Sequence, residues 1–180
     1  IQIKEYMKTE DSFYVSHECF CDILIIYTMK NDINIFITAD IIWFSHSTVR
    51  KVKNFISKHL SIQDKNIVLA ASHTHGTPNP EEAISFPIFS RKFDNHILNC
   101  IKKTFKEAYK KRKISTLVNF IRLPINDFSI NRRKKSFVFG KNIKYQMQNL
   151  PNFKKKIDEN IDLIDFQNRS SKKIVVSIVR

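Results

Sequence analysis

Glycine is scarce in this sequence, with only 2 residues among 180, against an average usage of about 7%. The three cysteines, Cys19, Cys21 and Cys100, are an odd number without metal-ribbon spacing, which argues against a disulfide scaffold and favours buried thiols. No run of about 18 uncharged apolar residues is present, so no membrane-spanning helix is expected. The first residues show neither an initiating Met nor a charged-then-apolar leader, and we therefore expect any signal peptide to lie outside this chain.

The sequence does contain enough apolar material for a folded core. Hydrophobic residues make up 42% of the chain and aromatic residues 12%. A length of 180 residues is that of about one domain. No internal repeat or low-complexity segment divides the chain. We therefore expect residues 1–180 to belong to a single globular domain.

Basic residues outnumber acidic ones, 31 to 17, and give a formal charge of +14. They cluster at residues 102–113, 132–135 and 154–156, and such clusters can neutralise nucleic-acid phosphates. The first cluster, however, alternates with apolar residues at helical spacing, as on one solvated helix face. Neither an aromatic-interleaved stacking platform nor a recognised binding motif accompanies the clusters. The pattern argues against nucleic acid as a partner, and a basic nucleic-acid-binding or interaction module without metal remains the alternative function.

The first part of the chain predicts a strand–helix–strand unit. Residues 22–29 and 35–39 are short apolar, β-branched runs around an Asn- and Asp-rich turn, which is typical of a β-hairpin. The second run is almost continuously apolar, as in a sheet covered on both faces. Residues 67–71 form a further strand, which the crossover makes parallel to the one before it. The intervening helix is expected from near Ser47 as N-cap, with an apolar stripe of Val49, Val52, Phe55, Ile56 and Leu60.

The rest of the chain completes an α/β pattern. Its expected elements are a Pro-containing loop at 81–91, an amphipathic helix at 93–113, a strand at 115–123, a basic irregular stretch at 134–160 and a closing hairpin at 162–179. Phe86 and Phe89 in the loop are candidates for a lid or substrate wall, or for ordinary packing. The predicted fold class is α/β, with a mixed, mainly parallel sheet flanked by helices.

His73 and His75 follow the strand at 67–71, where Gly76 and two prolines prevent the strand from continuing. In an extended segment the side chains at i and i+2 leave on the same face, which would place the two imidazoles roughly 6.5 Å apart by backbone rise. Ligand sites in such sheets gather beyond the carboxyl ends of the strands, and neutral imidazole is a good zinc ligand. The spacing alone leaves two interpretations open: a metal site, or hydrogen-bonded surface histidines.

The surroundings of this pair carry a family resemblance. A hairpin ending in Ala-Asp, a helix, the stretch Asp-Lys-Asn-Ile-Val-Leu-Ala-Ala-Ser-His-Thr-His at 64–75, and Ser-Ile-Asn-Arg at 129–132 follow one another in this order. The arrangement resembles the N-terminal catalytic domain of the neutral/alkaline non-lysosomal ceramidases, in which the strand before the site ends in Thr-His-Thr-His-Ser-Gly-Pro and a later loop carries Asn-Arg-Ser-Pro. The correspondence runs from about Cys21 to Arg132, and the closing hairpin also matches. It covers most of this chain but only part of a family catalytic domain.

The resemblance implies a role for each matched residue. It makes His73 a zinc ligand and places His75 beside the metal, where it would polarise or hold the substrate carbonyl or the developing oxyanion. Arg132 would supply a fixed positive charge to the same oxygen, with Asn131 in contact with the substrate. These roles agree with the needs of amide hydrolysis, which are an activated water and a stabilised oxyanion.

The sequence also departs from the family pattern. Gly-Thr replaces Ser-Gly after His75, and Arg-Lys replaces Ser-Pro after Arg132. The family's second zinc-binding histidine would fall just past Arg180, and its Glu and Tyr ligands and active-site Ser would lie further on. The resemblance therefore predicts a partial domain, truncated at its C-terminal end, with Zn²⁺ as cofactor and the remaining zinc ligands beyond Arg180.

Two of the singled-out residues keep an alternative interpretation. Arg132 stands within Arg-Arg-Lys-Lys, which is also typical of a solvated basic loop. Asp40, at the end of its strand, is expected to cap the following helix or to accept a hydrogen bond behind the metal ligands, and not to bind the metal itself.

The function implied by the resemblance is a zinc-dependent amide hydrolase. Its substrate would be an N-acyl lipid such as ceramide, cleaved to a sphingoid base and a fatty acid, and its basic surface could dock on anionic membranes. The family resemblance suggests a secreted, periplasmic or cell-surface location and leaves the oligomeric state open. A non-catalytic, ceramidase-like remnant is a further alternative.

Overall fold

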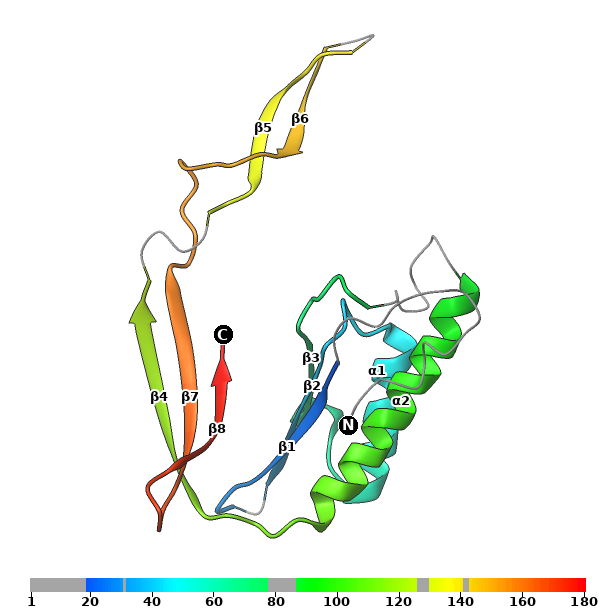
Figure 1. The fold of residues 1–180 in the computed structure, drawn as a ribbon, viewed down its shortest axis with the longest axis vertical. Helices are drawn as coiled ribbons and strands as arrows, with labels where there is room; N and C mark the ends of the chain where they lie inside the picture. Colours follow the sequence, from blue (N-terminus) through cyan, green and yellow to red (C-terminus); the bar gives the residue numbers. More distant parts are fainter. Residues whose placement is uncertain (1–18, 31, 78–86, 126–129, 141–142) are drawn as a thin grey trace. The chain divides into compact units, whose positions relative to one another are not determined.

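The computed structural model describes residues 19–30, 32–77, 87–125, 130–140 and 143–180 (Figure 1). The chain divides into two compact units, Ile1–Arg112 and Lys113–Arg180, and each is described by itself. Among the described residues, no helix combines the length and the apolar character that a membrane crossing requires.

A three-stranded sheet organises the first unit. β1 (Cys21–Tyr27) pairs antiparallel with β2 (Ile33–Ala39), and β2 pairs in parallel with β3 (Ile67–Ala71) (Figure 1). Thr28 closes the hairpin turn, because its backbone N–H donates to Asp32 O at 2.9 Å and its hydroxyl accepts from Asp32 N at 3.1 Å. The predicted hairpin and the predicted parallel pair are both confirmed.

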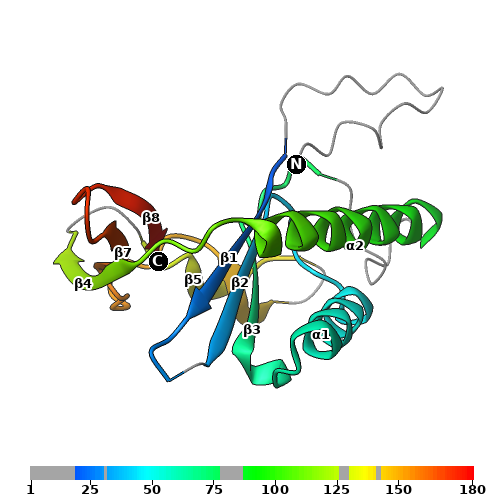
Figure 2. The same cartoon turned by 90° about the horizontal axis from the view of Figure 1, so that it is seen from below.

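Two helices lie on one face of this sheet (Figures 1 and 2). α1 (His46–Leu60) connects β2 to β3 through the single 3-10 turn η2 (Asp64–Asn66). α2 (Pro87–Lys110) begins before the start predicted for it, within a stretch expected to be loop. Phe89 therefore belongs to this helix, whereas Phe86, the other candidate for a substrate wall, lies outside the described residues.

The hydrophobic core lies between the sheet and the helices. Its buried members are Cys21, Ile35, Ile37, Ala39, Ile41, Val52, Ile56, Ile67, Phe93, Ile97, Leu98, Ile101 and Phe105. Complete burial of a side chain as large as Ile or Phe contributes about 1.5–3 kcal/mol. Packing of their apolar faces, more than intrinsic helix propensity, therefore stabilises α1 and α2.

The apolar run in β2 packs mainly on one face. Ile35, Ile37 and Ala39 are buried, whereas Phe36 is half-buried and Thr38 is exposed. The expectation of a sheet covered on both faces is therefore not met in the described residues. A nearly continuous apolar run can also alternate between a fully buried and a partly buried face, because only every second side chain meets the helices.

The cysteines agree with the prediction of thiols without disulfides. Cys21 and Cys100 are buried, Cys19 is half-buried, and all three are free. Burial raises the pKa of Cys21 to about 12, with a smaller contribution from Cys100. The Cys21 thiol therefore stays protonated at neutral pH and packs as a small apolar group.

The second unit contains an antiparallel sheet of β4 (Thr116–Pro124), β7 (Asn160–Asn168) and β8 (Ile174–Val179), in the order β4-β7-β8. The predicted closing hairpin is confirmed as β7 and β8. The prediction of a mainly parallel sheet is wrong, because β2–β3 is the one parallel pair among the described strands, which form three small sheets. β4 pairs with β7 instead of joining the first sheet, in a register that sets Arg122 opposite Asp162 and Phe120 opposite Ile164.

A two-stranded ribbon lies within the stretch that was expected to be irregular. β5 (Arg133–Val138) pairs antiparallel with β6 (Lys144–Asn149), so that prediction is wrong for these residues. The segment Lys-Tyr-Gln-Met-Gln at 144–148 does alternate with the period of two that a strand requires, whereas Lys-Ser-Phe-Val at 135–138 does not. The many lysines concealed this alternation, because they occupy both faces of the ribbon.

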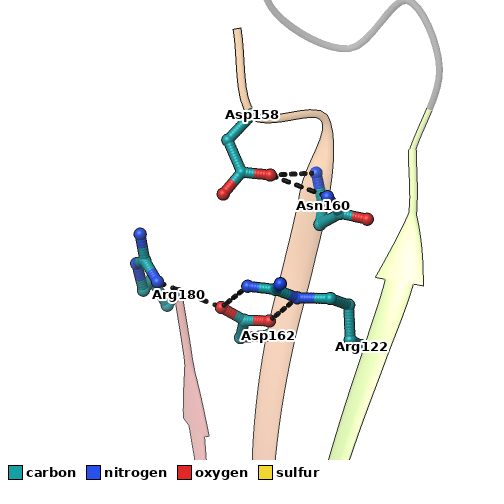
Figure 3. Close-up of polar contacts among 5 residues, drawn as sticks. All are labelled: Arg122, Asp158, Asn160, Asp162 and Arg180. Carbon is teal, nitrogen blue, oxygen red and sulfur yellow. Dashed lines mark hydrogen bonds and ion pairs between the residues drawn. The ribbon is translucent and has the colours of Figure 1, made fainter.

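A buried carboxylate joins the three strands of the β4–β7–β8 sheet (Figure 3). Asp162 of β7 accepts from Arg122 Nε at 2.6 Å and Nη2 at 2.9 Å, and from Arg180 Nη1 at 3.1 Å. The hydrogen bond from Arg122 is the main reason that the pKa of Asp162 is lowered. Arg180 directly follows β8, and its backbone is also paired with that of Asp162. Asp162 N donates to Arg180 O at 3.1 Å, and Arg180 N donates to Asp162 O at 2.9 Å.

The lowered pKa predicts an acid-sensitive second unit. A carboxyl whose pKa is lower in the folded than in the unfolded state stabilises the fold above the unfolded pKa, near 3.9 for Asp. That stabilisation is lost as the pH falls through the folded value. Hydrogen exchange of the β7 and β8 amides, corrected for intrinsic rates, should show protection that decreases below about pH 4.

Asp162→Asn should lower the protection of β7 and β8 at neutral pH and flatten its acid dependence, because the amide loses the charge that holds both arginines. Asp165→Asn is the matched control in the same strand. Asp165 accepts from Ser177 Oγ at 2.5 Å, and an asparagine oxygen can still accept that bond. Equal effects of the two substitutions would show that Asp162 has no special role.

Candidate metal site at the ends of β2 and β3

Two loops meet at the carboxyl ends of the parallel strands β2 and β3. The Ser72 backbone N–H donates to Ala39 O and that of His73 to Ile41 O, both at 3.0 Å. Ile41 and Ile42 are buried, at 2% and 8% exposure, so the loop after β2 is anchored in the core. The histidine loop is therefore attached to a firm backbone support, at the edge of the sheet where ligand sites form.

His73 has a left-handed backbone conformation, with φ 61°. This conformation is uncommon for residues other than glycine, although His adopts it more readily than most, and it costs on the order of 1–3 kcal/mol. The hydrogen bond from His73 N to Ile41 O helps to hold it. The chain thus turns directly after Ser72, and the rule for side chains in an extended strand does not apply to His73 and His75.

The His73 ring is oriented by the backbone of the neighbouring loop. Its Nδ1 lies 2.7 Å from the carbonyl oxygen of Ile42. A carbonyl oxygen can only accept, so Nδ1 carries the proton and donates it. In the neutral ring, Nε2 then presents its lone pair. Metal-binding histidines are commonly oriented by such a bond from the second ring nitrogen, and this geometry leaves Nε2 of His73 available as an acceptor.

His75 lies beside His73. The ring centroids are 5.2 Å apart and the ring planes are nearly perpendicular, at 88°. Both side chains are exposed, so a ligand can reach them. The structure brings the two imidazoles together, as the sequence suggested, but through the turn at His73 and not through a shared strand face.

A catalytic zinc needs about three protein ligands and one open position. Within the described residues, no group of three or more His, Cys, Asp or Glu side chains is arranged to hold a metal. His73 fits the role of one ligand, since its Nδ1 is anchored and its Nε2 has a free lone pair. The other ligands of a complete site would have to come from outside the described residues.

Asp40 supports the strand and does not cap the helix. Its Oδ2 accepts from Phe20 N at 3.0 Å, and its own N–H donates to Phe20 O at 2.9 Å. The N-cap of α1 is Ser45, whose Oγ accepts from Thr48 N at 3.1 Å. The prediction of Ser47 as N-cap was therefore wrong by two positions, because both serines have the required hydroxyl and only the backbone decides between them.

Arg132 and Asn131 lie in the second unit, immediately before β5. Arg132 is exposed, and Asn131 is half-buried. Asn131 Oδ1 accepts from Arg133 N at 2.9 Å, and Asn131 O accepts from Asn152 N at 2.7 Å. Asn131 therefore shapes the turn that presents Arg132, and its Nδ2 group takes no part in these two bonds.

Two of the other described histidines, His59 and His96, have local packing partners. The His59 ring packs against Phe105 and Tyr109, with centroids 5.4 and 5.5 Å apart. His96 Nε2 lies 3.5 Å from Cys100 Sγ on the same helix. These contacts agree with structural roles for both residues, and His17 lies outside the described residues.

The departure from the family pattern after His75 is not forced by the backbone. A Cβ added at Gly76 would meet Thr74 Oγ1 at 3.6 Å, which is an ordinary contact. The neighbouring Thr77 Oγ1 is buried and has no hydrogen-bond partner among the described residues. Among the described residues, the Thr77 hydroxyl, two residues after His75, therefore makes no hydrogen bond.

Sequence reasoning missed the groups that position His73. They are the backbone carbonyl oxygens of Ile41 and Ile42. Every residue has such a carbonyl group whatever its side chain, so the sequence does not mark these two. The order of the elements was the one available signal. Because β2 and β3 were predicted to be parallel neighbours, the loops that follow them, at 40–45 and 72–77, were expected to lie side by side.

Comparison with protein-family models finds no match, and comparison with curated proteins finds no significant match. Among solved structures, the fold is similar to part of neutral ceramidase from Pseudomonas aeruginosa, with a TM-score of 0.65 and 15% sequence identity. The similarity covers 90% of this chain and 26% of that chain, so the chain spans about a quarter of the length of the ceramidase. At this identity the match establishes the fold alone. The family resemblance noted in the sequence is confirmed at that level, for part of a ceramidase.

Proposed function

We propose that this chain forms part of a zinc-dependent amide hydrolase that resembles neutral ceramidase and cleaves an N-acyl lipid, such as ceramide, to a sphingoid base and a fatty acid. The observation that carries the proposal is the His73 ring, which is fixed through Nδ1 to Ile42 O at 2.7 Å. The ring stands at the carboxyl ends of β2 and β3, in a fold that is similar to part of neutral ceramidase.

His73 would hold zinc through Nε2, together with ligands from outside the described residues. When bound, the ion supplies an activated water and polarises the amide carbonyl. The bond from Nδ1 to Ile42 O keeps the ring in one orientation and one tautomer. Such pre-organisation favours metal binding because little ring rotation remains to be lost.

We assign His75 and Arg132 to the substrate oxygen. The His75 ring is exposed and 5.2 Å from that of His73, centroid to centroid, so it can donate a hydrogen bond to an oxygen next to the metal. Arg132 has a planar guanidinium with several N–H donors and is assigned to the same developing charge. Asn131 is assigned to the substrate through Nδ2.

An N-acyl lipid is found in a membrane, so the proposed function requires contact with a membrane surface. The formal charge of +14 supports association with anionic lipids, an attraction that salt screens within about 8–10 Å at physiological ionic strength.

Hydrolysis of an N-acyl sphingosine in detergent micelles tests the proposed function. The zinc-loaded protein that carries this chain should release fatty acid and sphingoid base in equal amounts. A chelator should stop the release, and added zinc should restore it, because the activated water requires the ion. Release that continues in the chelator, or an absence of release with zinc bound, would contradict the proposal.

A further inference from the structure

We propose that the β5–β6 ribbon docks this protein on the surface of anionic lipid bilayers by inserting its aromatic face between the headgroups. This proposal rests on the proposed function in one respect: the substrate, an N-acyl lipid, is found in a membrane. The contact itself is argued from the residues of the ribbon (Figure 1).

The ribbon and its surroundings form one of the basic regions of the chain. Residues 130–157 contain two arginines and seven lysines and no aspartate or glutamate. These nine are among the 31 basic residues that, against 17 acidic ones, give the chain its formal charge of +14. A segment of this charge is attracted to anionic headgroups over distances of about a Debye length.

One face of the ribbon is apolar and aromatic. Opposite residues of an antiparallel pair point to the same face, and the register pairs Phe137 with Tyr145 and Lys135 with Met147. The rings of Phe137 and Tyr145 are in contact, with centroids 5.0 Å apart. Both rings and Met147 are more than half exposed, at 62%, 61% and 51%. We call these four residues the aromatic face.

The opposite face of the ribbon is mostly polar, and Phe139 and Ile143 add exposed apolar side chains next to the ribbon. On the opposite face Lys134 stands opposite Gln148, and Ser136 opposite Gln146. Phe139 at the end of β5 is 80% exposed. An element that combines exposed aromatic and apolar side chains with neighbouring lysines is suited to the interface of a bilayer, where apolar groups enter the acyl boundary and lysines extend to the headgroups.

A bilayer fits this surface better than the other occupants. Single-stranded nucleic acid stacks its bases on aromatic rings, but the exposed apolar residues here include Ile143 at 66% and Met147 at 51% exposure, and neither has a ring. A covering protein surface is also less suitable, because lysines are depleted in the cores of protein interfaces. Lys135 lies within the aromatic face.

Co-sedimentation of the 180-residue chain with vesicles tests the proposal. The chain should partition strongly into vesicles of 70% phosphatidylcholine and 30% phosphatidylserine and weakly into pure phosphatidylcholine. Rising salt should weaken the partitioning into the anionic vesicles. Phe137→Ser should weaken partitioning about tenfold, as expected for the loss of one buried aromatic side chain. Lys135→Glu with Lys144→Glu should weaken it by at least about tenfold.

Each variant has a matched control outside the ribbon. Phe120 of β4 is 64% exposed, close to the 62% of Phe137, so Phe120→Ser removes a ring of similar exposure. Lys103→Glu with Lys106→Glu on α2 changes the net charge by the same amount as the ribbon pair. Controls that weaken partitioning as much as the ribbon variants would overturn the proposal, because general hydrophobicity or charge would then explain binding.

A reporter of insertion is independent of any loss of folding in the variants. Phe139→Trp in a Trp43→Phe background places the single Trp at the end of the ribbon, and its emission should shift to the blue with phosphatidylserine vesicles. An unchanged emission would overturn the proposal, as would binding of a single-stranded oligonucleotide in place of vesicles. These vesicles contain no N-acyl lipid and the micelle assay contains no bilayer, so docking and hydrolysis can fail separately.

Discussion

Replacing His73 with alanine is expected to abolish both stoichiometric zinc binding and amide hydrolysis in the protein that carries this chain. His73 presents Nε2 with its lone pair because Nδ1 donates to Ile42 O at 2.7 Å. Alanine removes one of the roughly three protein ligands of a catalytic zinc, and a hydrolase without its metal loses the activated water. Metal analysis by mass spectrometry and the micelle assay measure the two losses.

Two comparison variants make this prediction specific, one at His75 beside His73 and one at His59 on α1. His75→Ala should retain zinc and lose rate, since His75 is assigned to the substrate oxygen. His59→Ala should retain both, because His59 packs against Phe105 and Tyr109. If His73→Ala retains zinc while His75→Ala loses it, the assignments of the two residues are reversed.

Arg132→Ala is expected to lower kcat by about 10² to 10³ with a small change in KM. Loss of one charged donor to a developing oxyanion has an effect of this order, and a group that acts only in the transition state changes kcat more than KM. Arg132→Lys should restore part of the rate, because it returns the charge without the planar guanidinium.

Arg169→Ala is the matched control for Arg132, since Arg169 is also an exposed arginine of the second unit. It should leave kcat and KM close to those of the unaltered protein. If Arg132→Ala had as little effect as Arg169→Ala, Arg132 would belong to a solvated basic loop.

The first unit could be predicted well from sequence because its signals are local. The apolar runs at β1, β2 and β3 are bounded by turn residues, and the stripe on α1 repeats with the helical period, so elements and order followed directly. The arrangement of the second unit depends on contacts distant in sequence. The pairing of β4 with β7 joins Thr116–Pro124 to Asn160–Asn168, and no local pattern distinguishes it from a parallel neighbour in the first sheet.

The proximity of His73 and His75 was predictable from the sequence, but the geometry that produces it was not. The spacing of His73 and His75, with the chain breaking after them, indicated that the two rings lie close together. The left-handed backbone of His73 and the bond to Ile42 O depend on a neighbouring loop, which the sequence does not describe. The ribbon was missed for a related reason, because its lysines resembled those of an ordinary solvated surface until β5 and β6 were paired.

A zinc anomalous difference map from crystals of the zinc-loaded protein tests the central claim most directly. The account predicts a peak about 2.0–2.1 Å from His73 Nε2, with Nδ1 still donating to Ile42 O. A zinc peak at Nδ1, or a zinc site that does not include His73, would contradict it.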